Sequence, residues 1–145
     1  TQPWRMPPEV ARALGRFHVA GQEGAGIAHG DVAPWNLMRT AVGWSLIDWE
    51  DAGGCHPPFY DVFHFLVLSQ GLLDRPDQAT VVAGVTRLEG WIGEAIRAYA
   101  EGAGIGTDDV TERFEDFLVR IYQSTVERKG LRWFPDHVAG GGTGR

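Results

Sequence analysis

The segment HGDVAPWNLMRTAVGWSLIDWED, residues 29–51, places polar side chains around two short apolar runs. It contains a histidine, an asparagine and several aspartates in sequence rich in turn-forming residues. The runs NLMRT and WSLIDW alternate in part between apolar and polar residues and are joined by AVG, a pattern that predicts a β-hairpin. In this hairpin Asn36 would lie just before the first strand and Asp48 at the end of the second.

The rest of the chain shows mainly helical patterns. Apolar spacing predicts helices over residues 9–20, over YDVFHFLVLSQG from residue 60, over residues 76–100 and over residues 107–128. The glycine-rich end, residues 139–145, is predicted to be a flexible tail. The sequence therefore predicts one domain over residues 1–138, α+β and mainly α, with four helices and one small hairpin.

Composition excludes several classes of protein. With 145 residues and 43% hydrophobic content, the chain has the size and the apolar content of one globular domain. The net charge of −6 and the single lysine, Lys129, argue against nucleic-acid binding. The longest apolar run, residues 63–68, is too short to cross a membrane. A single cysteine, Cys55, cannot form an internal disulfide, which favours a cytoplasmic location.

The polar residues of the opening segment have the chemistry of a magnesium site. Carboxylate and amide oxygens suit Mg²⁺, which binds a few protein oxygens and completes its shell with phosphate and water. Asn36, five residues after Asp31, and Asp48, after the next strand, can converge on such an ion. Asp31 would then face a substrate hydroxyl. One carboxylate as base, with an asparagine and an aspartate on the metal, is what phosphoryl transfer to an alcohol requires.

The motifs HGDVAPWN and LIDWE resemble the catalytic loop, H-G-D-x-x-P-x-N, and the metal-binding segment, I-D-[WF]-E, of the aminoglycoside phosphotransferase and choline kinase family. Protein kinases, which are relatives of this family, keep the same Asp-to-Asn step in H-R-D-x-x-x-x-N. The resemblance by motif covers about residues 9–70, and the later helices only by layout. It implies the C-terminal lobe of a protein-kinase-like fold, with helices around a catalytic loop and the hairpin.

The resemblance also implies a role for each matching residue. Asp31 would be the catalytic base that orients the acceptor hydroxyl and takes its proton, and Asn36 and Asp48 would hold Mg²⁺ on the phosphates of ATP or GTP. His29 and Asp61 would support the catalytic loop, Asp61 from the start of the following helix. The implied reaction transfers a phosphoryl group from the nucleotide to a hydroxyl of a small molecule.

Each of these residues also has a structural interpretation. Asp31 can cap a turn, Asn36 is a common turn residue, and Asp48 can be a solvent-facing strand end. Metallophosphoesterases also use a Gly-Asp pair, but they need further His and Asp clusters that this sequence lacks.

The residues that flank the motif are expected to be mainly structural. Trp35 and Trp49 are expected to pack and to shield the site from water. Trp35, Glu50 and Asp51 are also candidate substrate contacts at the mouth of the site. Three further residues are expected to lie in the core or its rim, or to be inert: Tyr60, His64 and Cys55.

The resemblance implies an N-terminal lobe with a β-sheet, a phosphate-orienting lysine and the hinge that holds adenine. Residues 1–28 contain no lysine and no strand pattern, and the chain starts at Thr1. We therefore expect a C-terminal piece of a longer kinase, whose partners are the missing lobe and a small-molecule acceptor. The alternatives are one half of a two-chain enzyme, or a degenerate half that serves as a non-catalytic ligand-binding or scaffold module.

We expect the acceptor to be an aminoglycoside, an amino alcohol or a sugar. Acidic residues near the site and on the later helices favour a cationic acceptor, although helical acids usually form only a solvated face and a neutral sugar fits equally well. The helical acids are Glu89, Glu94, Glu101, Asp108, Asp109, Glu112, Glu115 and Asp116.

Overall fold

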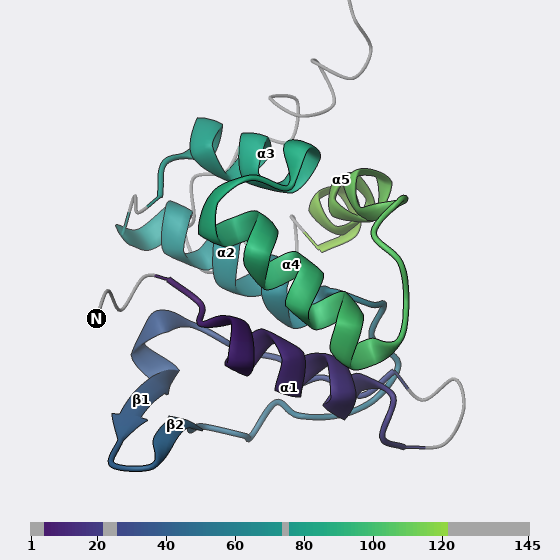
Figure 1. Cartoon of the computed structure of the whole chain (residues 1–145). Helices are drawn as coiled ribbons and strands as arrows, with labels where there is room; N and C mark the ends of the chain where they lie inside the picture. The colour runs from purple at the N-terminus through teal and green to yellow at the C-terminus, as the bar shows by residue number, and fades with distance from the viewer. Residues whose placement is uncertain (1–4, 22–25, 74–75, 122–145) are drawn as a thin grey trace, which may run out of the picture.

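The computed structural model describes residues 5–21, 26–73 and 76–121, which form five α-helices and one two-stranded hairpin (Figure 1). In chain order the elements are α1 (Pro8–His18), a 3-10 turn (Pro34–Asn36), β1 (Leu37–Thr40), β2 (Gly43–Leu46), α2 (Tyr60–Leu73), α3 (Gln78–Arg87), α4 (Gly90–Ala103) and α5 (Val110–Ile121). The predicted mainly helical α+β class is confirmed. The predicted tail and the end of the last predicted helix lie outside the described residues.

Helix α2 is the central element of the fold. Its residues from 60 to 69 are all buried, so this part of the helix is covered by neighbouring segments on every side. Phe63 contacts Phe114 and Phe117 of α5, with ring centroids 5.0 and 5.6 Å apart, and Phe65 contacts Trp91 of α4. Among the helices that the structure describes, none has both the length and the apolar character needed to cross a membrane.

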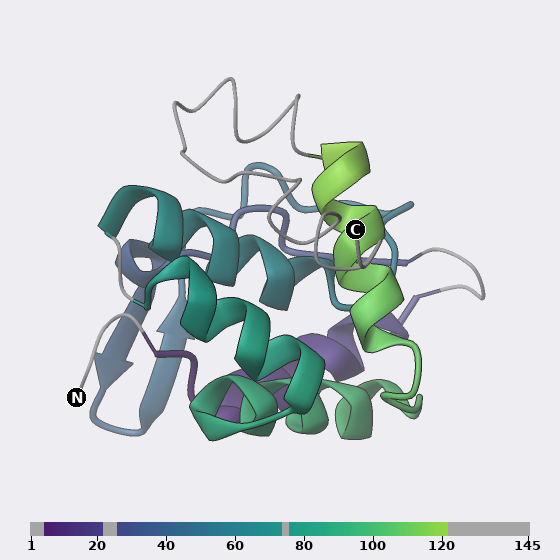
Figure 2. The same cartoon turned by 90° about the horizontal axis from the view of Figure 1, so that it is seen from above.

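Helices α1 and α4 pack at very short range. They lie side by side in Figures 1 and 2, where the hairpin and α5 occupy opposite ends of the molecule. A Cβ atom on Gly15 of α1 would overlap the backbone carbonyl of Tyr99, and one on Gly102 of α4 would overlap that of Arg12. Two glycines, one from each helix, therefore allow the backbones to touch, and an ion pair of 3.0 Å between Arg12 and Glu101 closes the exposed side.

The predicted hairpin is confirmed, with one correction. The strands are antiparallel and pair Leu37 with Leu46 at one end and Thr40 with Gly43 at the other. The second strand ends at Leu46, so Asp48 lies two residues beyond the strand and not at its end. Asp48 also adopts a left-handed backbone conformation, with φ of 65°, which cannot continue a strand.

The single helix predicted over residues 76–100 is wrong, because the chain breaks between α3 and α4. Leu88 has a left-handed conformation, with φ of 53°, and Glu89 is extended. The carbonyl of Leu88 accepts a hydrogen bond of 2.7 Å from Arg97. Val85 before the break and Ile92 after it are both buried, so the apolar spacing continues across the break. The sequence pattern therefore does not indicate that the helix ends there.

Gly102→Ala tests the contact between α1 and α4. Alanine favours a helix interior by about 1 kcal/mol over glycine, yet overlap with the Arg12 carbonyl should make the free energy of unfolding fall by about 1–3 kcal/mol. Urea unfolding measures this change. Gly106→Ala is the control, because a Cβ there meets nothing within 4 Å. An unchanged or higher stability of Gly102→Ala would show that the two helices can separate without loss.

Candidate active site

The candidate loop starts from a short antiparallel pairing. The Ala28 amide donates to the Gly53 carbonyl at 2.9 Å, and the Gly53 amide donates back to Ala28 at 3.1 Å. His18, the last residue of α1, anchors the approach through a hydrogen bond of 3.2 Å between its Nδ1 and the carbonyl of Ile27. Burial lowers the pKa of His18, although this hydrogen bond opposes the effect. A neutral His18 therefore joins α1 to the loop.

Asp61 binds the backbone of the loop from the first turn of α2. Its side chain is buried, and its two carboxylate oxygens accept the amides of His29 at 2.8 Å and Gly30 at 3.0 Å. Gly30 has φ of 94°, and a Cβ atom there would overlap the carbonyl of Asp51. The turn between His29 and Asp31 thus requires glycine. The resemblance implies a supporting contact of this kind for Asp61, and its importance for activity stays a prediction.

His29 connects the loop to the segment after the hairpin. The buried ring accepts the Asp31 amide at Nδ1, at 3.1 Å, and lies 3.0 Å from the Ile47 carbonyl at Nε2. These partners assign the neutral tautomer with its proton on Nε2, which donates to Ile47. Both ring nitrogens are therefore used in holding backbone, which is a structural role.

Asn36 and Asp48 are joined through Ile47. The backbone carbonyl of Asn36 accepts the Ile47 amide at 2.9 Å, and His29 holds the Ile47 carbonyl, so both sides of Ile47 are fixed. Asp48 follows directly, with an exposed side chain and a left-handed backbone that aspartate tolerates better than most residues. The structure thus places the Asp48 backbone next to the residue that pairs with Asn36.

The donor atoms at these two positions fit Mg²⁺. In the described part of the chain, no three His, Cys, Asp or Glu side chains are grouped to hold a metal by themselves. Asn36 is buried, and its amide nitrogen donates to the Asp31 carbonyl at 2.9 Å, which leaves Oδ1 as its ligand atom. One amide oxygen and one exposed carboxylate suit a cation that takes its other ligands from phosphate and water.

Asp31 lies beside His64, a histidine for which the sequence predicts only a place in the core or its rim. His64 is buried, as expected, but its Nε2 is 3.6 Å from Oδ1 of Asp31, and its Nδ1 is 3.1 Å from the carbonyl of Val32. The Asp31 side chain is 18% exposed, so it reaches solvent while it contacts this ring. The signal in the sequence was the spacing from Asp61 to His64, which puts both side chains on one face of a helix.

The flanking residues differ in how they pack. The Trp49 ring meets His29 edge-on, with centroids 4.4 Å apart, and contacts Phe17, while its Nε1 donates to the Leu46 carbonyl. Trp35 and Trp49 are 48% and 45% exposed, so each packs only in part. The remaining candidates at the mouth of the site, Glu50 and Asp51, are exposed, as is Cys55.

A largely apolar groove of about 480 Å³ separates α1 from the hairpin beside these residues. It is lined by Glu9, Val10, Ala13, Leu14, Phe17, Leu37, Val42, Gly43, Trp44, Ser45, Leu46 and Trp49. Leu37 and Trp49 are direct neighbours in sequence of Asn36 and Asp48. The groove therefore borders the chain next to the two candidate metal ligands, neither of which lines it.

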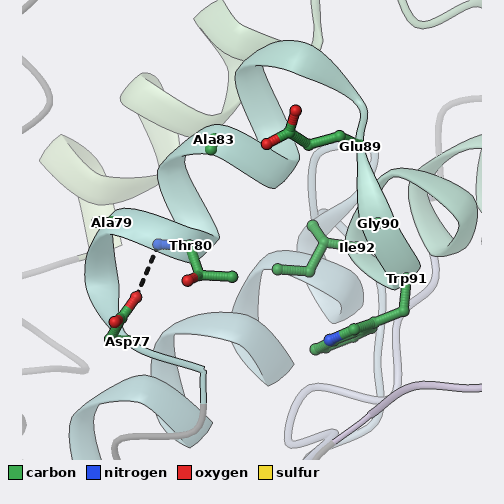
Figure 3. Close-up of a pocket in the computed structure, with 8 residues that line it drawn as sticks. All are labelled: Asp77, Ala79, Thr80, Ala83, Glu89, Gly90, Trp91 and Ile92. Atoms are coloured by element: carbon green, nitrogen blue, oxygen red, sulfur yellow. Dashed lines mark hydrogen bonds between the residues drawn. The ribbon is translucent and has the colours of Figure 1, made fainter.

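A second cavity, of about 410 Å³, lies at the N-terminal ends of α3 and α4 (Figure 3). It contains none of the predicted site residues. Asp77, its acidic residue on the α3 side, is the N-cap of α3 and accepts the Thr80 amide at 2.8 Å, an interaction that lowers the pKa of Asp77. Asp77 thus stabilises the start of α3, and we assign the cavity no part in the candidate site.

Asp61→Asn tests the attachment of the loop to α2. The amide group removes the negative charge and turns one N–H toward a backbone N–H, so we expect a loss of about 1–3 kcal/mol in the free energy of unfolding. Hydrogen exchange should speed up at the amides of His29 and Gly30 more than in α4. Unchanged exchange at these two amides would contradict the supporting role.

The chain was compared with known proteins. The sequence model of the phosphotransferase enzyme family matches residues 2–104, well over half of the chain. No curated protein and no solved structure matched. The matched region includes the loop, the hairpin and Asp61, which together carry the geometry described above. This chain belongs to the phosphotransferase enzyme family.

Proposed function

We propose that the chain is the C-terminal lobe of a kinase that transfers the terminal phosphoryl group of ATP or GTP to a hydroxyl of a small molecule. Membership of the family supports phosphoryl transfer in general. The observation that carries the proposal is the hydrogen-bonded network that joins Asp31, Asn36 and Asp48 through His29 and Ile47. This network fixes the backbone that carries a base and two oxygen ligands, as positional catalysis needs.

In the proposed reaction, the acceptor hydroxyl donates its proton to the Asp31 carboxylate. The hydroxyl oxygen forms a bond to the terminal phosphorus, and the bond from this phosphorus to the bridging oxygen breaks to release the nucleoside diphosphate. Asn36 and Asp48 would hold Mg²⁺, which neutralises phosphate charge when bound. His29 and Asp61 keep the loop in place and take no part in bond formation.

We further propose that an N-terminal lobe completes the site. Two side chains beside the candidate ligands, Met38 and Ile47, are large, apolar and 48% and 41% exposed, and they support a covering element or a nucleotide base at this face. The only lysine of the chain, Lys129, lies outside the described residues. A lobe that precedes residue 5 would supply the phosphate-binding lysine and the hinge.

The acceptor in this proposal is a hydroxyl compound with or without a positive charge. Several helical acids are engaged in exposed ion pairs, Asp109 with Arg113 and Asp116 with Arg120, so they support a solvated face and not a cation site. Glu50 and Asp51 are exposed next to the loop and support an aminoglycoside or amino alcohol. A sugar remains the neutral candidate.

Asp31→Asn tests the proposed base in the full-length protein that contains this chain. Loss of the proton acceptor should reduce kcat by about 100-fold or more, with the fold intact by circular dichroism. The assay would follow nucleotide consumption with ATP and GTP against aminoglycosides, amino alcohols and sugars. Asp108→Asn, at an exposed acid on the loop before α5, is the matched control.

Two outcomes would contradict these assignments. Wild-type kcat in Asp31→Asn would exclude Asp31 as the base. Absence of transfer by the wild-type full-length protein would favour the alternative of a non-catalytic ligand-binding or scaffold module.

Asp48→Asn tests the proposed metal ligand. Asparagine tolerates the left-handed backbone at this position, so the unfolding midpoint should stay unchanged. Replacing a charged oxygen ligand by a neutral one should raise the Mg²⁺ concentration for half-maximal activity by about tenfold or more. A magnesium titration of the transfer rate measures this change, and an unchanged requirement would remove Asp48 from the metal site.

A further inference from the structure

We propose that His64 is a positioning residue for the candidate base: its ring lies against Oδ1 of Asp31 from inside the protein and so fixes the direction of the carboxylate that would meet the acceptor. The proposal rests on the proposed function of Asp31 as base. It adds one residue to that function. The reaction would require the imidazole of His64, although this ring is buried away from the substrate.

The His64 ring is fixed on more than one side. Its Nδ1 lies 3.1 Å from the Val32 carbonyl, the residue directly after Asp31. Its face stacks with Tyr60, with ring centroids 6.0 Å apart, and Tyr60 in turn packs against Phe117 of α5 at 5.6 Å. A ring held in this way points Nε2 toward Asp31, where the distance to Oδ1 is 3.6 Å.

The chemistry of the ring determines what this contact can do. Because Val32 offers a carbonyl, Nδ1 must donate, and a neutral ring would then turn the lone pair of Nε2 toward the carboxylate. A second proton on Nε2 makes the contact attractive, with a cation behind the carboxylate. The distance of 3.6 Å is that of an ion pair and not yet of a hydrogen bond, and such contacts often tighten when substrate binds.

The titratable groups near the His64 ring include Asp31, Tyr60 and His56. Asp31 faces it from the loop, and Tyr60 faces it from the same helix. His56 lies on Tyr60, with centroids 4.3 Å apart, from the segment before α2. A carboxylate at the distance of Asp31 from Nε2 favours a proton on that nitrogen.

Helix α2 thus makes two different contacts with the loop. Asp61 binds the backbone amides of His29 and Gly30, and His64, one turn later on the same face, binds at Asp31 and Val32. The Asp61 contact fixes the position of the turn, and the His64 contact fixes the position of the Asp31 side chain. Both would be needed to fix a carboxylate oxygen relative to a hydroxyl.

A pair of variants in the full-length protein separates positioning from packing. Glutamine at this position can still donate an N–H toward Oδ1, whereas leucine fills the space without a donor. We expect His64→Leu to lower kcat by about tenfold or more with an acceptor KM within about threefold, and His64→Gln to keep kcat within about threefold. His56→Gln, at the ring that contacts Tyr60 from the segment before α2, is the matched control and should leave both constants unchanged.

Equal kcat values for the leucine and glutamine variants would overturn the proposal, as would a loss confined to KM. These comparisons require active wild-type protein, so a failure of the proposed function would appear first, as absence of transfer in the wild type.

A second measurement needs only this chain. Nitrogen-15 NMR of the imidazole rings should show a clear shift of Nε2 of His64 in Asp31→Asn, larger than the shift of Nδ1, which keeps its proton on the Val32 carbonyl. Both nitrogens of His18, a buried histidine bonded to Ile27, serve as the internal control. If the Nε2 resonance of His64 does not change in Asp31→Asn, the proposal is overturned, whatever the activity of the full-length protein.

Discussion

The paired hydrogen bonds from His29 and Gly30 to the buried Asp61 carboxylate hold the candidate site together. A carboxylate in a protein interior is costly unless its oxygens are bonded, and charged acceptors make stronger bonds than neutral ones. The position of Asp61 in the first turn of α2 adds the favourable end of the helix dipole. Any rotation of the turn would leave this charge unpaired, so the backbone before Asp31 has one stable orientation.

The fixed turn also constrains the position of the hairpin. Two strands of four residues are marginally stable by themselves, and this hairpin keeps its place through partial burial of Leu37, Trp44 and Leu46 against the core. Ile47, held by Asn36 on one side and His29 on the other, ties its end to the loop. Asp48 follows Ile47 directly, and both backbone polar groups of Ile47 are hydrogen-bonded. The exposed side chain of Asp48 therefore starts from a backbone with a defined position.

The sequence allowed prediction of those features that depend on local pattern. Apolar spacing predicted α1 and α2, alternation with turn residues predicted the hairpin, and the motif singled out the loop. The break at Leu88 could not be predicted from spacing, because Val85 and Ile92 stay buried in one continuous pattern across it. The contact of His64 with Asp31 spans 33 positions, and a histidine inside an apolar helix gives no sign of its partner. The left-handed backbone of Asp48 likewise follows Ile47, whose backbone is held by Asn36 and His29 from distant parts of the segment.

The distribution of charge explains why a histidine is suited to the place behind Asp31. The mouth of the site carries Asp48, Glu50 and Asp51, all exposed, and this negative potential opposes the approach of a triphosphate. Positive charge is needed at the phosphates, where Mg²⁺ and the proposed lobe would supply it. An arginine beside Asp31 would reach toward the same phosphates on a long side chain. The short, buried ring of His64 can orient the carboxylate from behind while it stays away from the face where the nucleotide would bind.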